Sequence, residues 1–205
     1  PVTVAQFRIF VEVSKYQPHD PDCLRGFSNH PVVWVTWYDA MAYCDWLTEQ
    51  LPKLPNLPSK LRHSWRATLP LETQWERAAR GMGDRIYPWG NEFDPGKANT
   101  RESGIGGTSA VGCFPAGGSP AGLLDASGNV WEWTRNCLES YPYPKIGADR
   151  NTIERFSTNN KDSMVLRGGS WFADRVHARC TNRHMINPDF GYYSFGFRVS
   201  LCAAS

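Results

Sequence analysis

A stretch in the middle of the chain, residues 122–133, carries the most information about the fold and reads GLLDASGNVWEW. It begins with residues that favour turns and ends with two tryptophans on either side of a carboxylate. Turn residues let the backbone change direction, and tryptophans bury large apolar surfaces. The stretch therefore predicts irregular chain stabilised by buried rings, and not a long regular element.

Four further stretches occur in a fixed order on either side of it. They read PVVWVTWYDA at 31–40 with YCDWL at 43–47, LPLETQWERAARG at 69–81, YPWGN at 87–91, and LRGGSW at 166–171 with GFR at 196–198. Each stretch alone is weak evidence, but their order and spacing together are specific. They resemble the formylglycine-generating-enzyme (sulfatase-modifying factor) superfamily, a branch of the C-type-lectin-like fold.

The resemblance covers nearly the whole chain and implies one α+β domain over residues 1–205. It implies a small twisted antiparallel sheet, few helices and much irregular structure, with a further N-terminal strand before Pro1. Arg167 and Arg198 stand beside apolar strand residues, so we expect their charges to have buried partners.

Composition excludes several classes of protein. Hydrophobic residues make up 41% and charged residues 20% of the 205 residues, which is typical of a globular domain. The 22 basic and 20 acidic side chains nearly cancel, so we expect no nucleic-acid partner. No apolar run approaches the ~20 residues that a membrane-spanning helix needs, so we expect no membrane segment.

Local patterns predict three helices. Thr3 can cap a helix with Val4, Phe7 and Phe10 on its buried side. A capping box at Thr36 predicts a second helix to about residue 51, and a third is expected over residues 72–80. Strands are expected at 31–35, 164–171 and 195–202, with an exposed insertion at 52–64, irregular chain at 87–135 and an exposed loop at 136–162.

The six cysteines form no CxxC pair, which argues against a zinc site made of cysteines. They are too sparse for a disulfide scaffold. We expect reduced, mostly buried thiols, with one or two disulfides as the alternative.

The central stretch also suggests a calcium site. Calcium prefers six to eight oxygen ligands, which an irregular loop can supply. The resemblance implies Asp125 and Glu132 as side-chain ligands and Gly128 and Val130 as backbone ligands. A second family site falls on Asn99, Thr100, Ser103 and Ile105, where a serine takes the place of the usual acidic ligand. Any calcium would be structural, and the alternative is that these residues only form turns.

The resembled enzymes bind copper(I) through two cysteines that follow the Gly-Gly-Ser-aromatic motif. Here residues 168–180 read GGSWFADRVHARC, which puts Ala173 at the first position and leaves the second without a cysteine. Cys180 corresponds to a structural cysteine of the family. A related branch makes sulfoxides with histidine-bound iron, but His177 and His184 are its only candidate ligands here. We therefore expect neither copper nor iron and assign no catalytic residue.

The segment from Phe172 to Ser194 instead has the composition of a binding surface, because it mixes aromatic, small and adaptable polar residues. It resembles the variable segment of diversity-generating-retroelement proteins, which use this fold. The candidate ligand-binding residues are Phe172, Ala173, Asp174, Val176, His177, His184, Phe190, Tyr192, Tyr193 and Ser194.

The sequence thus predicts a non-catalytic domain that binds a protein or another macromolecule through a variable surface. This resemblance favours a bacterial protein, either intracellular or displayed at a surface. The alternatives are another binding or regulatory module, a formylglycine-generating oxidase-like enzyme, or a non-haem iron sulfoxide-synthase-like enzyme.

Overall fold

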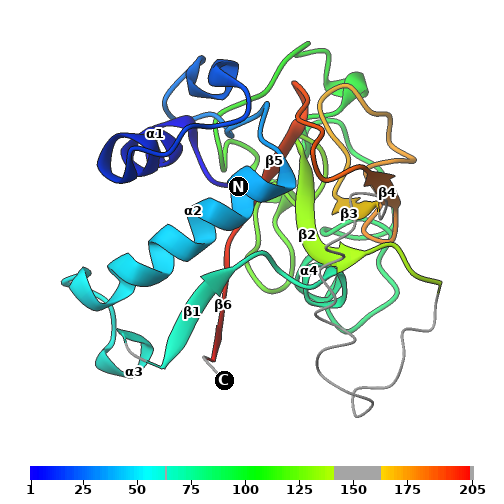
Figure 1. The fold of residues 1–205 in the computed structure, drawn as a ribbon. Coiled ribbons are helices and arrows are strands. Elements are labelled where there is room, and N and C mark those ends of the chain that lie inside the picture. Colours follow the sequence, from blue (N-terminus) through cyan, green and yellow to red (C-terminus); the bar gives the residue numbers. More distant parts are fainter. Residues whose placement is uncertain (63, 141–162, 204–205) are drawn as a thin grey trace.

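A computed structural model describes residues 1–62, 64–140 and 163–203 of the chain (Figure 1). It has a mixed α and β architecture in which short helices and two small sheets are joined by long irregular segments. This is the fold class that the sequence predicts. None of the helices in the described ranges is long and apolar enough to cross a membrane.

The larger sheet has four strands in the order β4-β3-β2-β5. Its strands are β2 (Trp131–Cys137), β3 (Met164–Arg167), β4 (Arg183–Ile186) and β5 (Phe195–Phe197). The β2–β3 and β3–β4 pairs are antiparallel, but β2 and β5 run parallel. The expected antiparallel arrangement is therefore confirmed for the β2–β3 and β3–β4 pairs and wrong for the β2–β5 pair. A second sheet pairs β1 (Trp65–Thr68) with β6 (Ser200–Ala203).

The three expected helices are present and begin where the caps predict. They are α1 (Val4–Ser14), α2 (Trp37–Gln50) and α4 (Glu72–Arg80). Capping boxes join Thr3 to Gln6 and Thr36 to Asp39, while Gly81 ends α4 with a φ of 76°. The smaller helical elements are η1 (Pro21–Leu24), η2 (Leu51–Lys53), α3 (Ser59–Arg62), η3 (Arg101–Ser103) and η4 (Pro115–Gly117).

Several strand predictions need correction. The segment 31–35 forms only a single bridge, from Pro31 to Thr3, because Trp34 adopts a φ of 62° that turns the chain. The strand expected at 164–171 ends at Arg167, since Gly168 and Gly169 both have positive φ. The strand expected at 195–202 divides into β5 and β6, and β1, β2 and β4 were not predicted.

These corrections also shorten the segments expected to be loops. The segment 87–135 is irregular until β2 begins at Trp131, and the first two residues of the segment 136–162 belong to β2. Residues 138–140 are exposed and irregular, as expected, and the rest of that segment, 141–162, lies outside the described residues. The insertion at 52–64 is largely exposed, as expected, but it also contains part of η2 and all of α3.

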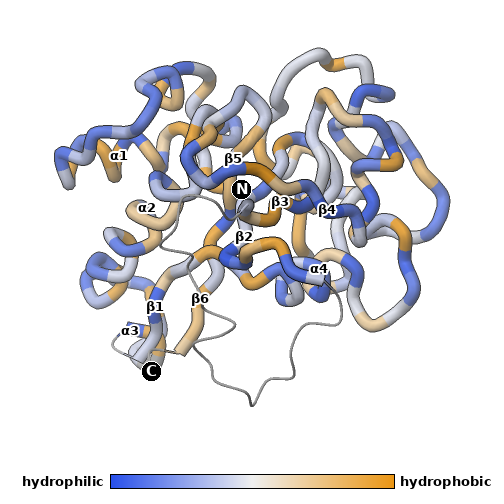
Figure 2. Tube along the Cα trace, turned by 45° about the vertical axis from the view of Figure 1, so that its right-hand side comes forward, coloured by the Kyte–Doolittle hydropathy of each residue, from blue (hydrophilic) through white to orange (hydrophobic). Residues whose placement is uncertain are grey.

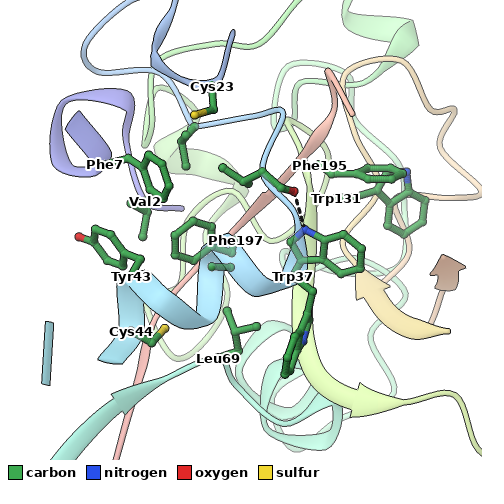
Figure 3. Close-up of a cluster of buried hydrophobic side chains, with 14 of the residues drawn as sticks. Val2, Phe7, Cys23, Trp37, Tyr43, Cys44, Leu69, Trp131, Phe195 and Phe197 are labelled. Atoms are coloured by element: carbon green, nitrogen blue, oxygen red, sulfur yellow. Dashed lines mark hydrogen bonds between the residues drawn. The ribbon is translucent and has the colours of Figure 1, made fainter. Parts of the chain in front are cut away.

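The hydrophobic core lies between α1, α2 and the larger sheet (Figure 3). The Tyr43 ring of α2 stacks on Phe7 of α1, with 5.9 Å between centroids, and meets Phe197 of β5 edge-on at 5.4 Å. Burial of an aromatic side chain of this kind stabilises the fold by about 2 kcal/mol. Figure 2 shows that much of the chain in the outer loops is hydrophilic, interrupted by short hydrophobic stretches.

Buried charges are paired, as expected for the two arginines. Arg167 contacts Glu76 and lies 3.6 Å from Glu72, while Arg198 binds Glu132. None of the six cysteines, all within the described residues, is in a disulfide; Cys23, Cys44 and Cys180 are buried, Cys137 and Cys202 partly exposed, and Cys113 is exposed.

Candidate functional site

Six rings from three distant parts of the sequence meet at one surface, which we call the aromatic face. The rings of Tyr192 and Tyr193 lie 4.0 Å apart, and Trp171 lies 5.5 Å from Tyr193. Phe172 and Trp34 each lie just over 6 Å from Tyr193, with edge-on geometry. Edge-on and offset pairs at such distances are favourable ring contacts. The aromatic face consists of Trp34, Trp171, Phe172, Phe190, Tyr192 and Tyr193.

Backbone hydrogen bonds fix these segments against one another. The Trp34 N–H donates to the Tyr192 carbonyl at 2.9 Å, and the Trp171 N–H donates to the Asn129 carbonyl at 2.9 Å. A Cβ atom at Gly191 would come within 2.9 Å of the Trp34 carbonyl oxygen, so only glycine allows this approach. The face is therefore positioned by the scaffold and does not depend on side-chain contacts alone.

The face presents apolar surface to solvent. Phe172 is 55% exposed and Phe190 is 46% exposed, while the other four rings are partly buried. The guanidinium of Arg101 lies 5.6 Å from the Phe172 ring centre, within the range of a cation–π contact. The Tyr192 and Tyr193 side chains are hydrogen-bonded to each other, and this bond raises the pKa of Tyr193. Exposed rings with polar tips are well suited to recognise another molecule.

Four predicted site residues form a separate turn outside the cluster of rings. Asp174 Oδ1 accepts hydrogen bonds from the backbone N–H groups of Val176 and His177 and lies 2.8 Å from His177 Nδ1. These contacts, led by the His177 side chain, hold the pKa of Asp174 below its usual range. Ala173 contributes only backbone bonds, to Ser170 and Arg101. The turn borders the aromatic face through Phe172.

Two other predicted residues point into the fold. Ser194 is buried, and its carbonyl accepts from the Trp131 N–H at 2.8 Å. His184 is partly buried on β4, with its ring 5.3 Å from Trp131 and 6.1 Å from Phe195. Burial lowers the pKa of His184, with a smaller contribution from His177. Both residues support the surface more than they form it.

Sequence reasoning missed Trp34 and Trp171 as members of the face. Trp171 was assigned to a strand and Trp34 to a buried strand. A positive φ at a bulky residue such as Trp34 is a genuine outlier and is found mostly where a site requires it. The sequence carries no local signal for this turn, since tryptophan does not favour it.

The first set of predicted calcium ligands does not provide a free carboxylate at Glu132. Its Oε2 accepts from Trp75 Nε1 at 2.5 Å and from Arg198 Nε at 2.5 Å, while Oε1 accepts from Arg198 at 2.6 Å. Asp125 Oδ2 accepts from the Gly112 N–H, and burial raises the pKa of the Asp125 carboxyl group. An ion held by Glu132 would have to displace Arg198, so the residues do not fit a calcium ion in this arrangement.

The second set lies beside the first, because Asn99 and Gly128 form a parallel bridge. The oxygens of this set are already engaged in hydrogen bonds within the loop, because Ser103 Oγ donates to both Asn99 Oδ1 and the Thr100 carbonyl. Ile105 is half exposed. In the described part of the chain, no three histidine, cysteine or acidic side chains gather so as to hold a metal ion. Calcium binding stays a prediction.

The position of the family's first copper-binding cysteine, Ala173, has no thiol. Cys180 is buried against Trp75, Ala79 and Ala126, and burial raises its pKa to about 12. A buried thiol of this kind is rarely ionised near neutral pH, so it is a poor metal ligand.

The chain is similar to several known proteins. It is 33% identical over 205 residues to the formylglycine-generating enzyme of Mus musculus. That alignment covers 91% of this chain and 48% of the mouse protein. It is 35% identical over 206 residues to the inactive C-alpha-formylglycine-generating enzyme 2 of Mus musculus, an alignment that covers 92% of this chain and 54% of that protein. The chain thus spans about half the length of these curated relatives.

Solved structures share the fold. The Treponema denticola variable protein 1 superposes with a TM-score of 0.72 at 22% identity, over 99% of this chain and 82% of that chain. PvdO from Pseudomonas aeruginosa superposes with a TM-score of 0.75 at 25% identity, over 97% of this chain and 76% of that chain. The model of the sulfatase-modifying factor enzyme 1-like domain matches residues 1–202, so the chain belongs to this family.

Proposed function

We propose that this chain is a non-catalytic domain that binds a protein or another macromolecule through its aromatic face. The observation that carries the proposal is the array of rings in which Phe172 and Phe190 are exposed beside the Tyr192–Tyr193 pair. Rigid rings with few rotatable bonds lose little entropy on binding, which is why such residues are enriched at binding surfaces.

The absence of the cysteine pair from the sequence supports a non-catalytic role. Ala173 cannot supply a thiolate, and Cys180 is buried among apolar side chains. Copper(I) prefers sulfur ligands, and one buried thiol cannot replace an accessible pair. A relative of comparable identity is itself named an inactive formylglycine-generating enzyme.

We further propose that the segment 172–194 is variable between copies of the gene. Its mixture of aromatic, small and adaptable polar residues supports this, and one solved structure with the same fold is named a variable protein. Its most exposed positions include Phe172, Val176, Met185 and Phe190, which can change without opening the core. The complete locus should contain a near-copy of the DNA that encodes this segment, with adenines at the differing positions. A complete locus without such a copy contradicts this part of the proposal.

The binding role can be tested without a known ligand. A phage library of random 12-residue peptides is panned on the chain, and the selected peptides are measured against Phe172→Ala/Tyr193→Ala. We expect their affinity to fall by about 30-fold or more, because anchor rings at interfaces typically contribute ~2 kcal/mol or more. Phe27→Ala is the matched control, since Phe27 is 72% exposed and contacts His30 outside the aromatic face.

Selected peptides that bind the double variant and the parent equally would contradict the proposal. The double variant avoids Tyr192, whose ring also packs on buried Phe195 at 5.5 Å. Its unfolding transition must match that of the parent for the comparison to hold.

The alternative function is formylglycine generation, which the names of several relatives favour. It is tested by incubating the chain with copper(I), oxygen and a cysteine-containing sulfatase peptide, followed by mass spectrometry of the peptide. We expect no formylglycine above the protein-free control. Conversion that depends on the chain would overturn the non-catalytic proposal.

A further inference from the structure

A hollow of about 650 Å³ lies beside the C-terminal end of α4, apart from the aromatic face. Its walls come from α4, the turn that follows it and the beginning of β4. Arg77, Arg80 and Arg183 line the hollow together with the hydroxyl-bearing Thr73 and Thr181. Its volume lies within the range of small-molecule sites, and its lining shares no residue with the aromatic face.

Arg77 is the uncompensated charge of this hollow. It is exposed on α4, and its side chain makes no hydrogen bond or ion pair within the residues that the structure describes. The neighbouring carboxylates are engaged elsewhere. Glu72 receives two hydrogen bonds from Arg183, at 2.6 and 2.8 Å, and Glu76 contacts Arg167.

Arg80 is incompletely satisfied. Its terminal nitrogens lie 3.6 Å from Glu76 and 3.2 Å from Asp84, longer than the 2.7–2.9 Å of a strong charge-assisted bond. Its Nε–H is buried and has no acceptor in the described part of the chain. A buried donor without an acceptor is rare in native proteins, so this N–H group is available to an acceptor.

The balance of charge around the hollow favours an anion. Four guanidinium groups, on Arg77, Arg80, Arg167 and Arg183, stand against three carboxylates, on Glu72, Glu76 and Asp84. The guanidinium of Arg85 also lies beside the lining residues Gly81 and Gly83, so positive charges outnumber negative ones. Asp84 is fully exposed, so solvent screens its charge. The C-terminal end of α4 opposes an anion, so the affinity should be modest.

A second, more apolar hollow of about 470 Å³ adjoins the first. The two share Arg77, Gly81 and Met82, and the second adds Pro120 and Ala121. Met82 is 82% exposed, an unusual state for a large apolar side chain. A ligand with a charged head at the arginines could therefore place an apolar group on Met82.

We propose that the paired hollows bind a phosphate or sulfate monoester. Its oxyanion contacts Arg77 and Arg80, and its apolar group lies against Met82 and Pro120. Arginine is suited to this task because its planar guanidinium presents two N–H groups to two oxyanion oxygens at once. Threonine hydroxyls at positions 73 and 181 supply further donors.

The test is a calorimetric titration of the chain with phenyl phosphate, phenyl sulfate and inorganic phosphate at constant ionic strength. We expect saturable binding of an ester, with inorganic phosphate at least about fivefold weaker because it lacks the apolar group. Arg77→Gln should weaken ester binding about tenfold or more, which is the typical effect of losing a hydrogen bond to a charged group. Met82→Ser should remove the preference for the ester over the inorganic ion.

Arg25→Gln is the matched control, because Arg25 is an exposed arginine whose ion pair within the described ranges is the surface contact with Asp22. It should leave ester binding unchanged. The absence of saturable binding, or equal affinity of Arg77→Gln and the parent, overturns the proposal. Equal affinity for the ester and for inorganic phosphate overturns the claim that the apolar group of the ester lies against Met82 and Pro120. The Phe172→Ala/Tyr193→Ala variant should bind the ester normally, so this test is independent of the proposed recognition function.

Discussion

Arg198 and Glu132 form a two-point ion pair at the centre of the fold, with N–O distances of 2.5 and 2.6 Å. Glu132 is fully buried on β2 and also accepts from the indole of Trp75 on α4. Its neighbours across the sheet are Arg167 and Gly196. The pair thus connects the stretch 122–133, which contains Glu132, to the Gly-Phe-Arg stretch, which contains Arg198, and the Trp75 contact connects both to α4.

Replacement of Glu132 by glutamine should lower the free energy of unfolding by about 3–5 kcal/mol, because it leaves the Arg198 charge inside the protein without its partner. Urea denaturation followed by tryptophan fluorescence measures this change. Asp22→Asn, which breaks the exposed pair with Arg25, should cost less than about 1 kcal/mol. A similar small loss for Glu132→Gln would show that the buried pair is not a stability determinant.

The helices could be predicted because their signals are local. Thr3 and Thr36 each stand three residues before a side chain that returns the capping bond, so the sequence alone marks where α1 and α2 begin. The strands were harder to place. Strands of three or four residues, such as β4 and β5, are too short for a period of two to be recognised, and their partners are distant in sequence.

The binding segment could be located from its composition, but its geometry could not. Tyr192 and Tyr193 face Trp34, which is more than 150 residues away in the chain, and the contact depends on a backbone turn that tryptophan rarely makes. Conversely, the composition also predicts His184 and Ser194 at the surface, although both face inward. His184 lies on β4, where the sequence alone cannot distinguish the two sides of the strand, and Ser194 is buried in the turn before β5.

Gly191→Ala should disturb the aromatic face through the backbone. The added Cβ atom would stand 2.9 Å from the Trp34 carbonyl oxygen and 3.0 Å from its carbon, so the two segments must separate. We expect a loss of about 1–3 kcal/mol in unfolding free energy, together with weaker binding of the panned peptides. Gly107→Ala is the control, because a Cβ atom there meets nothing within 4 Å. If both variants match the parent, the close approach does not hold the face together.

His184 should make the protein less stable in mild acid. Its pKa is lowered in the folded state by burial, so the unfolded state, with a pKa near ~6.5, binds a proton first as the pH falls. The resulting stability is present above pH ~6.5 and is lost as the pH drops through that value towards the lower folded pKa. Urea denaturation at pH 7.5, 6.0 and 5.0 measures the slope.

His184→Gln should have a flatter pH dependence than the parent over that interval. His19→Gln, which changes an exposed histidine, is the matched control and should keep the slope of the parent. An unchanged slope in His184→Gln would show that another group accounts for the loss of stability in acid.

The family resemblance implies calcium binding, although the first set of residues does not fit an ion while Arg198 holds Glu132. A comparison of Tm in 1 mM CaCl₂ and in EGTA tests whether either set binds the ion. An ion that binds only the folded state, at a free concentration 100 times its Kd, adds about 2.7 kcal/mol to the unfolding free energy, which corresponds to a shift in Tm of about 5–10 °C for a domain of this size.

Two variants distinguish the two sets of ligands. Asp125→Asn should abolish the shift if the ion uses Asp125 with the carbonyls of Gly128 and Val130, whereas Ser103→Ala should abolish it if the second set binds. Because Arg198 occupies both oxygens of Glu132, an ion at the first set must break that pair, and the gain would be smaller. Equal Tm values in CaCl₂ and EGTA would contradict calcium binding at both sets and leave the Arg198–Glu132 pair intact in either solution.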